Sequence, residues 1–179
     1  MECEDLEPYV PEFENPYPDP SLLQITDFVY STPIHLCRCI EAVQRRKGED
    51  ADYIVSQPYT VRFKLQGAGR QVTVPEGMVT DLSSVPWIAR WIIGRVGPHL
   101  EASIVHDFLY IAWQDVEGRG PREQDREFAD KLLRVAMEEA SVGPIRRYLI
   151  YAAVRMFGGG AYRREDPVRY VRDRSNGTG

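Results

Sequence analysis

Residues Pro98–Trp113, with the sequence PHLEASIVHDFLYIAW, decide the fold, and they predict one helix. Proline suits the first position of a helix, where its missing N–H costs nothing. At about 100° per residue the apolar residues gather on one side, namely Leu100, Ile104, Phe108, Ile111 and Ala112. Residues spaced three or four apart occupy the opposite side, namely His99, Ser103, His106, Tyr110 and Trp113. We therefore expect this helix to be covered on both sides.

The doublet His106-Asp107 is the chemical centre of this helix. A buried carboxylate without a hydrogen-bond donor is very costly, so the doublet needs partners elsewhere in the chain. One interpretation is a structural histidine in the core beside an aspartate on the helix surface. The other is a functional site, and the helix alone does not separate the two.

The composition indicates a single globular domain without a membrane span. The chain has 179 residues, of which 43% are hydrophobic and 27% charged, as in ordinary soluble domains. No apolar run approaches the ~20 residues of a spanning helix, and the N-terminus lacks a signal-peptide pattern. A net charge of −5 argues against nucleic-acid binding by the whole protein. Cys3, Cys37 and Cys39 are too few for a zinc site and are expected to be reduced.

The two ends of the chain differ in charge. Residues 1–24 form a proline-rich arm whose first 20 positions hold seven acids and no base. This density of proline favours an extended segment, and we expect it to pack against a partner or another copy without forming secondary structure. Residues 161–179 form an arginine-rich tail without periodicity. Both ends could instead be solvated termini.

The remaining pattern, residues 25–160, predicts one α+β domain in which a small antiparallel sheet precedes three or four helices. Alternation and turn residues predict strands at 25–30, 53–56, 60–65 and 71–74, with a weaker one at 34–44. Gln66–Gly69 is expected to be a hairpin turn, and Pro75–Gly77 a second turn. Further helices are predicted at 87–93, 121–140 and 144–157, the last of which Gly158–Gly160 would end.

Two further stretches carry candidate site residues. Asp81 and Ser84, in TDLSSVP (80–86), could fix a turn or cap the next helix, or they could face His106-Asp107 and hold a hard cation. Asp125 lies on the apolar stripe of the 121–140 helix and therefore needs a donor. We expect that donor to be His106, directly or through Tyr110, although an acid in a first turn also suits the helix dipole.

These motifs resemble domain-of-unknown-function family 1353. The resemblance covers roughly 58–158 and consists of VPEGMVTDLSSVP, HDFLY, the QDREF helix and VRMFG, in that order. The family is common in bacteriophage and prophage genomes and has no settled activity. It implies a phage protein of the virion or host cytoplasm that contacts other phage subunits, or its own copies, through the arm and the tail.

The pattern H-D-x-x-Y, with an aspartate from a second helix, also resembles the catalytic helices of phospholipase A2. That resemblance implies His106 as general base, Asp125 as its orienting acid, Tyr110 as a brace and Asp107 as a calcium ligand. Asp81 and Ser84 would replace the missing glycine-rich calcium loop. Two functions thus stay open: a virion structural protein, or a calcium-assisted ester hydrolase of phage entry or lysis. A histidine–aspartate phosphohydrolase would need more histidines than His35 and His99.

Overall fold

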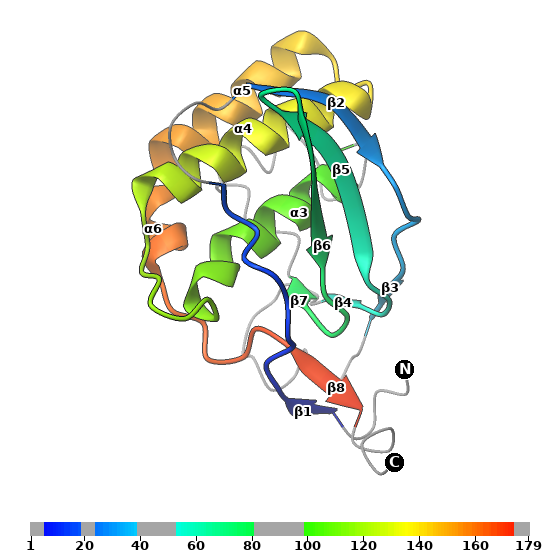
Figure 1. The fold of residues 1–179 in the computed structure, drawn as a ribbon, viewed down its shortest axis with the longest axis vertical. Coiled ribbons are helices and arrows are strands. Elements are labelled where there is room, and N and C mark those ends of the chain that lie inside the picture. Colours follow the sequence, from blue (N-terminus) through cyan, green and yellow to red (C-terminus); the bar gives the residue numbers. More distant parts are fainter. Residues whose placement is uncertain (1–5, 19–23, 39–52, 81–98, 174–179) are drawn as a thin grey trace.

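The computed structural model describes residues 6–18, 24–38, 53–80 and 99–173, and it is an α+β fold (Figure 1). The main sheet has the strand order β2-β5-β6, with β2 at Ile25–Tyr30, β5 at Tyr59–Leu65 and β6 at Ala68–Val74. A smaller sheet joins β3 (Leu36–Cys37), β4 (Tyr53–Val55) and β7 (Val79–Thr80). All of the described strand pairs are antiparallel.

The hairpin of β5 and β6 follows the predicted alternation but has a tighter turn. Val61, Phe63 and Leu65 are buried, whereas the intervening Arg62 and Lys64 are exposed. Leu65 pairs with Ala68, so only Gln66 and Gly67 form the turn. Both have positive φ, 53° and 80°, as a type I′ turn requires. The expected four-residue turn is therefore wrong, and its last two residues belong to β6.

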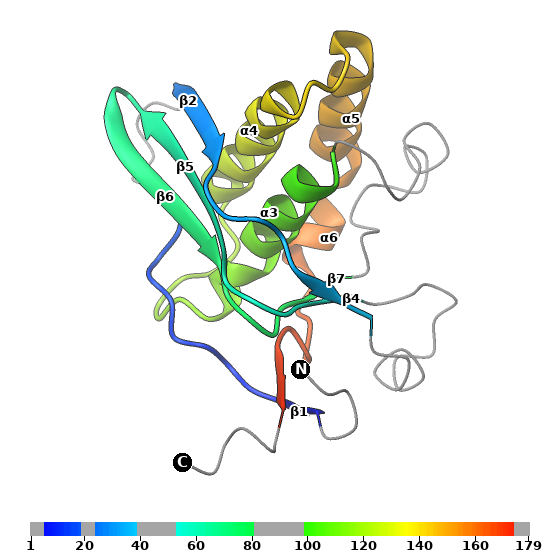
Figure 2. The ribbon, with the colours of Figure 1, turned by 90° about the vertical axis from the view of Figure 1, so that its right-hand side faces the viewer.

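Four α-helices follow the sheets within the described residues. They are α3 (Leu100–Ile111), continued by the 3-10 turn η1 (Ala112–Gln114), then α4 (Glu123–Glu139), α5 (Pro144–Phe157) and α6 (Gly159–Arg163). The predicted helix at 87–93 lies outside the described residues. Figure 2 shows α3 and α4 against one face of the main sheet, with α5 on the side of α4 away from it. The helix α4 thus has neighbours on two sides, because it contacts β2, α3 and α5.

The core lies between the main sheet and the helices α3 and α4. Phe63 of β5 meets Phe128 of α4 with ring centroids 6.0 Å apart. The hydroxyl of Tyr30 in β2 donates to the carbonyl of Ala136 in α4 at 2.7 Å. The apolar side of α3 is buried here as predicted, with Ile104 and Phe108 almost fully enclosed. No helix in the described ranges is long and apolar enough to cross a membrane.

The described part of the arm packs on its own domain. Its strand β1 (Leu6–Pro8) pairs with β8 (Val171–Asp173). Beyond β1, three aromatic side chains contact the domain. Tyr9 donates to the carbonyl of Glu76 at 2.7 Å, Phe13 packs on Phe108, and Tyr17 donates to the carbonyl of Leu109 at 2.6 Å.

The expectation that the arm forms no secondary structure is therefore wrong, because β8 supplies backbone partners that composition does not reveal. Intermolecular binding by the arm stays a prediction.

The last described part of the chain also packs on the domain. The helix α5 ends at Phe157 as predicted, but α6 begins at Gly159 and carries Tyr162, which is buried. Tyr170 and Val171 are buried as well, so the packing extends beyond residues 25–160 on both sides.

Candidate functional site

The polar side of α3 faces a carboxylate of α4 in the interior of the protein. Oδ1 of Asp130 lies 2.9 Å from Nε2 of His106 and accepts a 2.7 Å hydrogen bond from the hydroxyl of Tyr110. His106 is 3% exposed and Asp130 is 0% exposed. His106 and Tyr110 are four residues apart on α3, so one carboxylate oxygen reaches both side chains. The structure thus brings two of the predicted site residues together on an acid that was not predicted.

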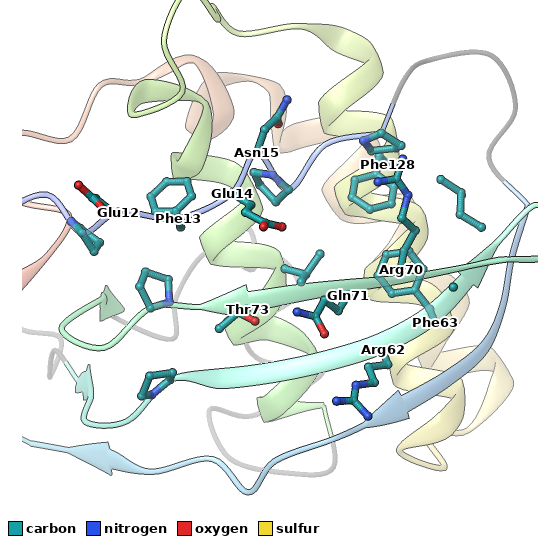
Figure 3. A pocket seen from close by; sticks show the side chains of 18 of the residues that line it. Glu12, Phe13, Glu14, Asn15, Arg62, Phe63, Arg70, Gln71, Thr73 and Phe128 are labelled. Atoms are coloured by element: carbon teal, nitrogen blue, oxygen red, sulfur yellow. The ribbon is translucent and has the colours of Figure 1, made fainter.

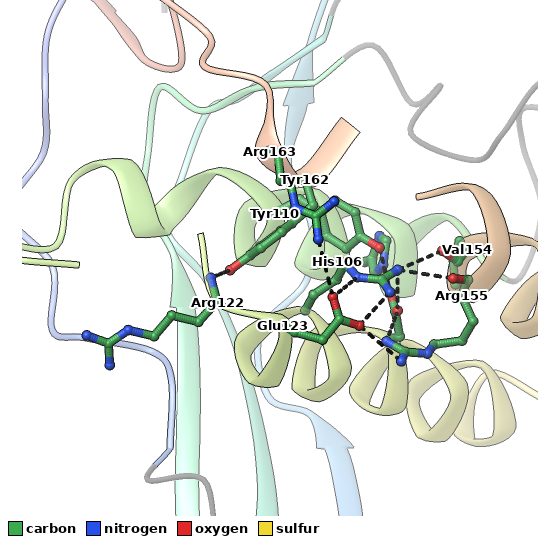
Figure 4. Close-up of polar contacts among 10 residues, drawn as sticks. His106, Tyr110, Arg122, Glu123, Val154, Arg155, Tyr162 and Arg163 are labelled. Carbon is green, nitrogen blue, oxygen red and sulfur yellow. Dashed lines mark hydrogen bonds and ion pairs between the residues drawn. The ribbon is translucent and has the colours of Figure 1, made fainter. Parts of the chain in front are cut away.

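Arginines complete the surroundings of Asp130. Arg155 of α5 donates from Nη1 to Oδ2 at 3.0 Å, and Arg126 lies one turn before Asp130 with Nη1 3.7 Å from the same oxygen. Both arginines also contact Glu123, Arg126 at 2.6 Å and Arg155 at 3.3 Å. Figure 4 shows Glu123 and Arg155 beside His106 and Tyr110, with Arg163 reaching toward Glu123. We call His106, Tyr110, Glu123, Arg126, Asp130 and Arg155 the Asp130 cluster.

The hydrogen bonds of the Asp130 cluster fix its protonation. Burial alone would raise the pKa of Asp130, but donation from His106, Tyr110 and Arg155 outweighs burial and lowers it. The Arg126 guanidinium likewise lowers the pKa of Glu123. Burial and the nearby Asp130 carboxylate raise the pKa of Tyr110. At neutral pH the cluster therefore contains two carboxylates and a protonated phenol.

Tyr110 is held between aromatic rings and a close backbone contact. The centroid of its ring lies 4.0 Å from the ring centroid of His106 and 5.3 Å from that of Tyr162, and the Tyr162 ring meets it edge-on. A Cβ at Gly158, where α5 gives way to α6, would lie 2.6 Å from the Tyr110 hydroxyl. Only glycine therefore allows this junction to approach the hydroxyl so closely.

The predicted hydrogen bond from His106 or Tyr110 to Asp125 is wrong. Both oxygens of Asp125 accept from Arg119, at 2.7 Å each, in a bidentate pair. Arg119 lies in the loop before α4, only six positions from Asp125, and it satisfies the buried acid locally. Asp130 thus makes the contacts with His106 and Tyr110 that were predicted for Asp125.

Asp107 is buried and contacts the smaller sheet. Its Oδ2 accepts a 2.7 Å hydrogen bond from Oγ1 of Thr80 at the end of β7. The other predicted metal ligands, Asp81 and Ser84, lie outside the described residues. Within the described ranges no group of three or more His, Cys, Asp or Glu side chains could hold a metal ion. Calcium binding by Asp107 therefore stays a prediction.

The sequence did contain a signal for the residues that were missed. On α4 the predicted stripe holds Asp125, Phe128, Leu132 and Ala136, and it faces α3 and the sheet. A second stripe holds Arg126, Asp130, Leu133 and Met137, all of them buried. These positions are four, three and four residues apart, so they share a helix face. Two buried stripes on one helix indicate two neighbours, and Asp130 lies on the stripe that the prediction did not include.

A separate cavity of about 1050 Å³ lies beneath the arm, against β5 and β6. Figure 3 shows Phe13 of the arm above it and Phe63 and Phe128 at one end. Its lining carries both signs of charge, including Arg62, Arg70, Glu12 and Glu14. None of the Asp130 cluster lines this cavity, so the two regions are distinct, and the mixed charges select no single class of ligand.

The molecule is therefore an α+β domain built around a buried histidine–aspartate–tyrosine contact. The chain belongs to the family DUF1353, a protein family of unknown function, whose model matches residues 53–154. This range contains His106, Tyr110 and Asp130 and ends one residue before Arg155. No curated protein and no solved structure matches the chain.

Proposed function

We propose that His106 is the general base of an ester hydrolase site, oriented by Asp130 and braced by Tyr110. The observation that supports this is the single oxygen, Oδ1 of Asp130, which contacts both Nε2 of His106 and the hydroxyl of Tyr110. This is the arrangement that the phospholipase A2 resemblance implies, with Asp130 in the place expected for Asp125.

The chemistry follows from the tautomer that this contact favours. A carboxylate at Nε2 favours the imidazole with its proton on that nitrogen, which leaves Nδ1 as the basic nitrogen. Nδ1 can then take a proton from a water molecule that attacks an ester carbonyl, while Asp130 stabilises the imidazolium that forms. The lowered pKa of Asp130 suits this role, because the carboxylate stays ionised across the neutral range.

Asp107 would hold the group that polarises the ester, a calcium ion. It adjoins the base in sequence and contacts Thr80, directly before Asp81. We propose that Asp107 binds calcium together with Asp81, Ser84 or a backbone carbonyl, since calcium prefers six to eight oxygen ligands. When bound, the ion would polarise the ester carbonyl.

The test is hydrolysis of phospholipid vesicles and soluble esters with and without millimolar calcium. We expect calcium-dependent release of fatty acid that His106→Gln abolishes. Glu127→Gln, at a partly exposed acid of α4 that pairs with Lys131, should leave it unchanged. Calorimetry should show calcium binding that Asp107→Asn removes. Absence of both ester hydrolysis and calcium heat in the wild-type chain would refute the hydrolase.

A virion-associated structural role is the second candidate, and the exposed apolar face of α5 supports it. Ile145, Tyr148 and Met156 are each more than 60% exposed, which suits a contact between subunits. Together with the family resemblance, this favours a phage protein that is assembled into a particle or acts in the host cytoplasm. Purified particles of a phage that encodes the chain should contain it in fixed stoichiometry. Its absence from particles would contradict this role.

A further inference from the structure

The outward side of α5 concentrates the exposed apolar side chains of the molecule. Across the described ranges seven large hydrophobic side chains are exposed, and five of them belong to this helix. We call these five the α5 face: Ile145, Tyr148, Leu149, Met156 and Phe157, exposed by between 44% and 77%. With the smaller Ala152, positions 145, 148, 149, 152 and 156 follow one helical stripe.

The three arginines of α5 lie outside the stripe itself. Arg147 has a side chain 18% exposed and pairs with Glu138 of α4, and Arg155 points inward to Asp130. Arg146 is partly buried and lies beside Ile145 and Leu149 at one end of the stripe. Helices that lie on membranes or nucleic acid flank their contact surface with several free lysines and arginines. Because Arg147 and Arg155 are paired within the protein, the α5 face suits an apolar protein surface better than a membrane or a nucleic acid.

The size of the α5 face is enough for a small dimer interface. From their exposed fractions the five residues leave on the order of 600–700 Å² accessible, at the low end of the ~600–1,000 Å² that each partner contributes to a standard interface. It is also at least as large as the largest apolar patch of a typical monomer, ~300–600 Å². Ala152 lies near the middle of the stripe, where a small side chain lets two helices approach closely.

We infer that the α5 face binds the α5 face of a second copy, antiparallel across a two-fold axis near Ala152. In a two-fold contact the same patch serves both partners, so the Ile145 end of one helix lies against the Met156 end of the other. A stripe without charges allows this, since no like charges are brought together. This inference is independent of ester hydrolysis.

Mass measurement by light scattering after gel filtration, over a range of concentrations, is the first test. The wild-type chain should have twice the mass of one chain, and Tyr148→Glu should raise the dimer dissociation constant at least about thirty-fold. Val29→Glu is the matched control, because Val29 is also an exposed apolar residue but lies on β2, and it should leave the dimer intact. Urea unfolding of each variant verifies that it is folded. A wild-type chain that is monomeric at every concentration would overturn the inference.

Crosslinking tests the two-fold geometry. With serine at the native cysteines, Ala152→Cys should form a disulfide-linked dimer with diamide, because the axis places the two new thiols together. Gln71→Cys, on the exposed part of β6, is the matched control and should not crosslink beyond the cysteine-free parent. A dimer in which Cys at position 152 crosslinks no better than this control, or a ladder of larger species, would refute the antiparallel pair.

Discussion

The helix α4 holds two buried aspartates five residues apart, and their surroundings differ in kind. Asp125 is satisfied by Arg119, which lies six positions earlier in the same stretch of chain. Asp130 is satisfied by His106 and Tyr110 of α3 and by Arg155 of α5. Asp125 therefore fastens a loop to the start of α4, whereas Asp130 joins three helices.

This difference shows that burial of a carboxylate implies a hydrogen-bond donor nearby but does not indicate where in the chain that donor lies. A local arginine satisfies the requirement with little loss of chain entropy, because the loop between the partners is short. The long-range contacts of Asp130 depend on the whole helical layer being assembled. The two acids should therefore respond very differently to substitution.

Asp130→Ala should have the largest effect, a loss of about 3–5 kcal/mol in the free energy of unfolding. It removes the acceptor of His106, Tyr110 and Arg155 and leaves Arg126 and Arg155 with only Glu123 as a nearby acid. Urea denaturation followed by circular dichroism measures the loss. A loss below about 1 kcal/mol would mean that the Asp130 cluster does not hold the helices together.

A double-mutant cycle separates the two acids next. His106→Ala and Asp130→Ala should be coupled by about 1.5–3 kcal/mol, as expected for a charge-assisted hydrogen bond in the interior. The cycle of His106→Ala with Asp125→Ala should be additive within about 0.5 kcal/mol. Equal coupling in both cycles would contradict the assignment of Asp130 as the partner of His106.

Asp125→Ala alone should cost less, about 1–2 kcal/mol, because only Arg119 loses its partner and its guanidinium keeps its contact with the Tyr17 ring. Arg119→Ala should cost a similar amount, and the double variant little more than either single one. Denaturation of the three variants by urea tests this. If Asp125→Ala proved as damaging as Asp130→Ala, the distinction between a local and a long-range site would fail.

The smallest predicted effect is in the pH dependence. The pKa of Asp130 is lower in the folded state than in the unfolded state. The stability that ionised Asp130 provides is therefore complete above the unfolded-state pKa of about 3.9, and it is lost as the pH falls through the folded-state pKa. The stability difference between the wild type and Asp130→Asn should stay constant above about pH 5 and shrink below about pH 4. If the stability difference instead grew toward acid pH, folding would raise the pKa of Asp130 and the assigned direction would be wrong.

Much of the fold could be predicted because the signals are local. The period of α3 placed His106 and Tyr110 on one side, and the alternation of Val61, Phe63 and Leu65 gave β5. The partner of His106 could not be predicted in the same way. Asp125 and Asp130 both lie on buried stripes of α4, and the choice depends on the positions of Arg119 and Arg155 in space. The pairing of β1 with β8 could not be predicted either, because a three-residue strand is too short to show an alternating pattern.

That pairing also has a consequence for the order in which the protein is completed. Leu6 lies opposite Asp173, so β1 can pair only after β8 has been synthesised. During synthesis residues 6–8 emerge well before β8 and cannot pair with it until residues 171–173 leave the ribosome. The contact of Tyr9 with Tyr170 depends on the same late part of the chain, whereas Phe13 and Tyr17 contact α3, which is made earlier. We therefore expect the pairing of β1 with β8 to be a late event of folding, after the sheets and helices between these strands are made.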